Sequence, residues 1–88
     1  MTKREYLESV GYEYDDWYED LPINIFEKIY RGRDDDEYLR AAINLDDNYY
    51  YLDPSPCFSI TSQEQINLIQ MAFDSLKKVY EEMQKYGD

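Results

Sequence analysis

The sequence of 88 residues contains no histidine and one cysteine, and each shortage excludes a class of site. Catalytic triads of the Ser-His or Cys-His kind need an imidazole, as do zinc sites that contain histidine. Cys57 alone can build neither a disulfide framework nor a thiolate zinc site, so we interpret it as a small buried apolar residue of a protein in a reducing compartment. No catalytic motif is present, and so small a core can hardly enclose a pocket. We therefore predict a protein that is not an enzyme and has no metal and no cofactor.

Long apolar runs and clusters of basic residues are also missing. No stretch approaches the ~20 apolar residues of a membrane span. The early bases Lys3 and Arg4 are followed by Glu5 and Glu8 instead of the apolar segment of a signal peptide. Clustered bases would attract nucleic acid or anionic lipid, and the acidic balance argues against both. We expect a cytoplasmic protein of a bacterial host cell that binds neither a membrane nor nucleic acid directly.

Acid is what the sequence has in excess. There are 20 Asp and Glu residues against 9 Lys and Arg, which gives a net charge of -11, and 11 tyrosines lie among them. That charge exceeds the magnitude of roughly 2 to 8 that keeps a small domain soluble. Aromatic residues make up 17% of the chain, too many for a disordered acidic tail. We therefore expect one folded domain over residues 1–88 whose charge serves a basic partner, the alternative being an ordinary domain from an acidic proteome.

The two ends of the chain carry the clearest helix signals. Thr2 and Glu5 have the spacing of a capping box, and the short helix that follows should end near Val10. From Thr61 or Ser62 onwards, apolar residues recur every three or four positions up to Gly87. This period predicts a C-terminal helix of about 25 residues.

The middle of the chain is more ambiguous. Apolar spacing over residues 22–32 predicts a second short helix, opened by a proline. Acidic residues 34–37 favour the start of a third helix, although a strand over residues 37–45 is the competing interpretation. Residues 49–52 are rich in strand formers, and residues 57–60 could pair with them. The expected fold is therefore α+β and mostly helical, with three short helices and a small β-hairpin packed on one long C-terminal helix.

The acidic residues are segregated from the basic ones along the chain. From Glu5 to Glu27, with both included, there are eight acids and no base, and there is no base from Ala41 to Leu76. On a helix, carboxylates three or four residues apart form a ladder with a spacing similar to that of phosphates. Residues 13–20 would offer such a ladder if they were helical, and residues 34–37 would extend it, as would Asp46, Asp47 and Asp53. Without local counter-ions these acids repel each other, so we expect Asp15→Asn with Asp16→Asn to leave stability equal or higher.

The candidate contact residues are acidic, or are aromatic residues able to supply rigid contact area to an interface. They are Glu13, Asp15, Asp16, Trp17, Tyr18, Glu19, Asp20, Asp34, Asp35, Asp36, Glu37, Asp46, Asp47 and Tyr50. A plain helix start would also explain residues 34–37, and a turn would explain residues 46 and 47. Strand alternation sends Tyr50 to one face and its neighbours to the other, so at least one of these tyrosines should be exposed.

These features lead to a hypothesis of inhibition by mimicry. A small acidic protein can fill the cationic groove in which a nuclease, restriction enzyme or CRISPR-type effector binds DNA or RNA, as anti-CRISPR and antirestriction proteins of phages do. An immunity protein or antitoxin that neutralises a basic nuclease toxin is an alternative with the same physics. A third alternative is a helical assembly module whose long helix pairs with another, either as a homodimer or with a partner helix.

Overall fold

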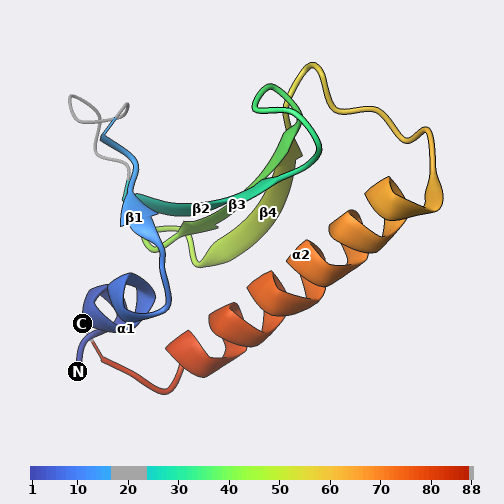
Figure 1. Cartoon of the computed structure of the whole chain (residues 1–88). Coiled ribbons are helices and arrows are strands. Elements are labelled where there is room, and N and C mark those ends of the chain that lie inside the picture. The colour runs from blue at the N-terminus through green and yellow to red at the C-terminus, as the bar shows by residue number, and fades with distance from the viewer. Residues whose placement is uncertain (17–23, 88) are drawn as a thin grey trace.

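The computed structural model describes residues 1–16 and 24–87, in which an antiparallel sheet carries helices on one of its faces (Figure 1). Helix α1 spans Lys3–Ser9 and helix α2 spans Gln63–Met83. The strands are β1 (Glu13–Tyr14), β2 (Ile25–Arg31), β3 (Tyr38–Asn44) and β4 (Tyr49–Pro54). They lie side by side in the order β1-β2-β3-β4, so each strand pairs with the next one along the chain.

The helices at the two ends of the chain confirm their sequence signals. The hydroxyl of Thr2 accepts a hydrogen bond from the backbone N–H of Glu5 at 3.1 Å, and the Glu5 carboxylate accepts one from the N–H of Thr2 at 2.9 Å. These two bonds are the predicted capping box. The long helix is also present, but it has 21 residues and ends at Met83. The backbone at Gly87 then bridges to Thr2, which brings the two ends of the chain together.

The other two predicted helices are wrong, because residues 22–32 and 34–43 contribute strands β2 and β3 instead. Residues 22 and 23 lie outside the described part, and Ile25–Arg31 is extended. Phe26 and Tyr30 are four residues apart, a spacing that places two side chains on one face of a strand as well as of a helix. The strand over residues 37–45, which was the competing interpretation, matches β3.

The predicted hairpin has the right strand but the wrong partner. β4 confirms the strand expected at residues 49–52, but it pairs with β3 across a turn at residues 45–48. Asp47 donates its N–H to the side chain of Asn44 in that turn, and Asn48 has a positive φ of 55°. Residues 57–60 form no strand, and Cys57 is exposed, in contrast to its predicted burial.

The core lies between the sheet and the two helices. Seven fully buried side chains form it, with α2 lying across β3 and β4. They are Leu7, Tyr12, Phe26, Ala41, Ile43, Leu76 and Met83. Removing this much apolar surface from water is the main term that stabilises the fold. The C-terminal part of the apolar stripe of α2, which includes Leu76 and Met83, is therefore used inside the domain. Neither described helix has the length and apolar character that a membrane crossing requires.

Candidate protein-binding surface

One face of the sheet lies away from the helices and carries most of the charged side chains of the strands. We call it the acidic face and define it by Glu13, Asp15, Glu27, Arg40, Tyr49, Tyr51 and Asp53. Residues paired across an antiparallel sheet point to the same side. The pairs Glu13 with Glu27, Arg40 with Asp53, and Asn44 with Tyr49 therefore all belong to this face. Side chains at the alternate positions, such as Phe26 and Tyr50, point towards the helices.

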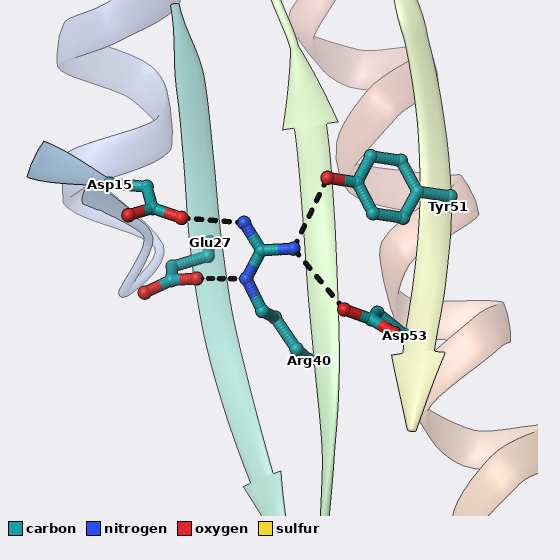
Figure 2. Close-up of polar contacts among 5 residues, drawn as sticks. All are labelled: Asp15, Glu27, Arg40, Tyr51 and Asp53. Carbon is teal, nitrogen blue, oxygen red and sulfur yellow. Dashed lines mark hydrogen bonds and ion pairs between the residues drawn. The ribbon is translucent and has the colours of Figure 1, made fainter. Parts of the chain in front are cut away.

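Arg40 is the centre of the acidic face (Figure 2). Its Nη2 lies 2.6 Å from Oδ2 of Asp15, and its Nε donates to Oε2 of Glu27. Its Nη1 donates to the hydroxyl of Tyr51 at 3.1 Å and lies 3.7 Å from Oδ2 of Asp53. These partners come from both neighbouring strands and from the segment after β1, so a single guanidinium ties the sheet together across its width.

The surroundings of Arg40 stabilise the protonated, positively charged form of its side chain. Burial disfavours the charged form, but hydrogen bonds to Tyr51, Glu27 and Asp15 outweigh that effect and raise the pKa of Arg40 above its ordinary value. The side chains of Arg40 and Asp15 are 13% and 11% exposed, whereas that of Asp53 is 58% exposed. Arg40 therefore pairs with Asp15 and Glu27, but one guanidinium facing three carboxylates leaves the cluster negatively charged, and Asp53 is its most exposed carboxylate.

This cluster corrects one premise of the sequence analysis. Asp15 was expected to lack a counter-ion, but Arg40, which is remote in sequence, pairs with it. Strand β1 also contradicts the helical ladder at its start, because Glu13–Tyr14 is extended. The structure therefore removes the reason to expect that Asp15→Asn leaves stability equal or higher.

The other candidate residues lie at the ends of the sheet or outside the described part. Asp34, Asp35, Asp36 and Glu37 are in the connection between β2 and β3, where the N–H of Glu37 donates to the C=O of Asp34 at 3.0 Å. Asp46 and Asp47 are in the turn between β3 and β4, as the turn interpretation predicted. Successive hairpin connections lie at opposite ends of a meander, so the structure separates these two acidic groups by the length of β3. The candidates Trp17, Tyr18, Glu19 and Asp20 fall outside the described residues.

The tyrosine triplet alternates as the sequence predicted. Tyr49 is exposed and stacks on Tyr51 on the acidic face, with ring centroids 5.8 Å apart. Tyr50 points to the opposite side, where its ring lies 4.7 Å from that of Tyr80 in α2. Tyr50 was a candidate contact residue, and the structure places it away from the acidic carboxylates.

Sequence reasoning missed the roles of Glu27, Arg40 and Tyr51. A signal for them was present in the competing strand interpretation of residues 37–45. If that strand pairs with residues 49–54 across a turn at residues 46–48, Arg40 falls opposite Asp53, and such a pair of opposite charges stabilises a sheet. The link to Glu27 required β2 to be extended, which its apolar spacing did not reveal.

Comparison with protein families, with curated proteins and with solved structures finds no match to this chain. The described residues also contain no group of histidine, cysteine or carboxylate side chains placed to hold a metal ion. Where carboxylates converge around Arg40, its guanidinium occupies the position that a metal ion would take. Inferences about function therefore depend on the shape and charge of the surface.

Proposed function

We propose that the protein is an inhibitor that binds the cationic DNA- or RNA-binding site of another protein by mimicking nucleic acid. The observation that carries this proposal is the distribution of exposed carboxylates along the sheet. They occur at one end in residues 34–36, at the other end in Asp46 and Asp47, and between the ends at Glu13 and Asp53. The seven residues of β3 span about 20 Å at roughly 3.3 Å per residue. That is the length of about six base-pair steps of 3.4 Å.

The basic residues near these carboxylates support the proposal because they are used within the molecule. Arg31 donates to the backbone C=O of Asp35, and Arg33 pairs with Glu64 of α2 at 3.0 Å. Arg40 is enclosed by its own carboxylates. Arg33 and Arg40 pair with carboxylates, whereas the bond of Arg31 to a neutral carbonyl leaves its charge in place beside the four acids of residues 34–37. Carboxylates still outnumber the bases at this sheet, and the negative potential steers a cationic groove towards it.

The proposed target is a nuclease, restriction enzyme or CRISPR-type effector in the cytoplasm of a bacterial cell. Binding would be competitive, because the inhibitor and the nucleic acid would occupy one groove. A basic nuclease toxin with this protein as its antitoxin is a second version of the same proposal. The two versions differ in whether the target is encoded beside the inhibitor or belongs to a host defence system.

Affinity capture with nucleic-acid competition tests the proposal. The protein is immobilised, a bacterial lysate is passed over it, and proteins retained above moderate salt are challenged with duplex DNA and with RNA. We expect a nucleic-acid-binding protein to be retained and then displaced by one of these competitors. A retained protein that neither DNA nor RNA displaces would contradict mimicry.

Matched charge variants make the test specific to the sheet. We expect the triple variant Asp34→Asn, Asp35→Asn, Asp36→Asn to weaken binding about tenfold, equivalent to about 1.4 kcal/mol. The control removes the same charge from exposed positions on the helices, through Glu8→Gln, Asp74→Asn and Glu81→Gln. Equal weakening by both variants would show that net charge alone, and not the carboxylates of the sheet, attracts the target.

A further inference from the structure

The outer edge of β4 has no neighbouring strand among the described residues. Just past its end, Ser55 donates its N–H to the C=O of Tyr38 at 2.9 Å, which shows which residues face β3. The direction of backbone hydrogen bonding alternates along an antiparallel strand. The N–H and C=O groups of Tyr50 and Leu52 therefore point away from β3, towards the outside of the sheet.

The open part of this edge is short and bounded at both ends. At one end, the C=O of Asn48 accepts a hydrogen bond from the hydroxyl of Tyr80 at 2.7 Å. At the other end, Pro54 has no N–H to donate. Proteins commonly protect sheet edges with proline and with short strands, because an open edge invites pairing with another chain. Here the strand is short and ends in a proline, but the N–H and C=O groups of Tyr50 and Leu52 can still pair with another strand.

Apolar side chains lie beside the open edge on the helix side. Phe73 and Ile66 of α2 are 43% and 44% exposed, and they are seven residues apart, which places them on one side of the helix. The ring of Phe73 lies 6.0 Å from that of Tyr50, so this side of α2 faces β4. An extended chain paired with β4 would therefore place every second side chain near Ile66 and Phe73.

The intervening side chains of such a chain would meet the acidic face. Asp53 is exposed there, next to an Arg40 cluster in which three carboxylates face one guanidinium. A basic residue at these positions would find an opposite charge. A second copy of this protein carries the same net charge of -11, so pairing two copies at this edge would bring negative surfaces together.

We propose that β4 receives an extended segment of the cationic partner as a further strand of the sheet, with apolar and basic residues alternating along that segment. The backbone of Tyr50 and Leu52 supplies the hydrogen bonds, Phe73 and Ile66 contact the apolar side chains, and Asp53 pairs with a basic one. In this mode of recognition, main-chain hydrogen bonds supply affinity and alternate side chains supply specificity. The partner's positive charge rests on the proposed function, whereas the pairing edge does not.

A synthetic peptide of alternating lysine and valine is the probe for this edge. Its control is the same peptide with its central amides N-methylated, which keeps the charge and the side chains but removes the hydrogen-bond donors. We expect the unmethylated peptide to slow hydrogen exchange of the Tyr50 and Leu52 amides about tenfold, as seen by NMR, and the methylated peptide to leave them unchanged. Equal binding of both peptides, or no binding of either, would overturn strand addition.

Two variants of α2 test the apolar part of the contact. Phe73→Gln should weaken peptide binding about fivefold, whereas Met71→Gln should leave it unchanged. Both residues are exposed and apolar, but Met71 lies on the side of α2 that faces away from β4. Equal effects of the two variants would contradict a contact at Phe73. Circular dichroism of each variant checks that the helix is retained.

The mass of the free protein and the nucleic-acid competition separate the remaining outcomes. A dimer with protected Tyr50 and Leu52 amides in the absence of peptide would show that a second copy occupies the edge, and would overturn the proposal. Peptide binding at the edge without displacement of the captured target by nucleic acid would refute mimicry alone. Displacement by nucleic acid without protection of the edge would refute strand addition alone.

Discussion

Arg40 shows how one residue makes an acidic sheet possible. Glu13 and Glu27 are directly opposite each other on adjacent strands, an arrangement of like charges that destabilises a sheet. The guanidinium of Arg40 bonds to Glu27 and Asp15, so two of the carboxylates on this face become partners instead of neighbours that repel. The planar group with its several donors can contact all of these acceptors at once, which a lysine ammonium cannot do in the same geometry.

We predict that Arg40→Met destabilises the protein by about 3 kcal/mol, because it leaves Asp15 and Glu27 partly buried without a counter-ion. Urea denaturation at neutral pH measures the change. Adding Asp15→Asn and Glu27→Gln to the variant should recover much of the loss. The control is Arg33→Met, whose pair with Glu64 is exposed, with an expected change below about 0.5 kcal/mol. A similar small loss in both variants would show that the Arg40 cluster contributes no more than a surface pair.

The connection between α1 and β1 depends on the backbone of one residue. Gly11 follows the C-cap Val10 and has a φ of 93°, a backbone conformation that residues other than glycine rarely adopt. The side chain of Lys28 passes over it and donates to the C=O of Val10 at 3.2 Å. The sequence predicted this position as the end of the first helix, and the structure confirms it.

We predict that Gly11→Ala destabilises the protein by about 1–2 kcal/mol because of strain at the positive φ. Thermal or urea unfolding measures the loss. Gly87→Ala is the matched control, since a Cβ at Gly87 would meet no atom within 4 Å, and it should have little effect. If Gly11→Ala is as stable as Gly87→Ala, the α1 to β1 connection does not need the left-handed conformation.

The strands β2 and β3 show why helix and strand signals were confused. The spacing of Ile23, Phe26, Ile29 and Tyr30 fits one helix face. In the sheet, Phe26 and Tyr30 lie on one face of β2 and Ile29 lies on the other, and Ile25 and Phe26 are both buried. At Ile25 and Phe26 both faces of β2 are covered, so apolar and polar residues do not alternate there. Periodicity therefore could not separate the two structures here.

The charge of the whole molecule opposes its own folding. With a net charge of -11, the carboxylates at the ends of the sheet repel one another through solvent. Salt screens such interactions, because the Debye length falls from about 30 Å at 0.01 M to about 8 Å at 0.15 M. Salt should therefore stabilise the fold while it weakens attraction to a cationic partner.

We predict that raising the salt concentration from about 0.01 M to about 0.15 M increases the free energy of unfolding by about 1 kcal/mol. For a domain of this size, that corresponds to a rise in Tm of about 4–8 °C. The triple variant of residues 34–36 to asparagine should show a smaller rise, because it carries less charge to screen. A Tm that falls with salt would mean that ion pairs, rather than repulsion, dominate the surface.

Local sequence patterns were enough to predict the two terminal helices of this protein, and composition was enough to predict its charge. The capping box at Thr2 and Glu5, the turn at residues 46–48 and the long C-terminal helix depend on contacts between residues close in sequence, so local patterns reveal them. The acidic excess follows from composition alone. Tertiary structure was needed to show that β2 and β3 are strands, that Arg40 pairs with Asp15 and Glu27, and that β4 has an open edge. These features depend on pairing between distant segments, and the spacing of side chains within each segment fits more than one such arrangement.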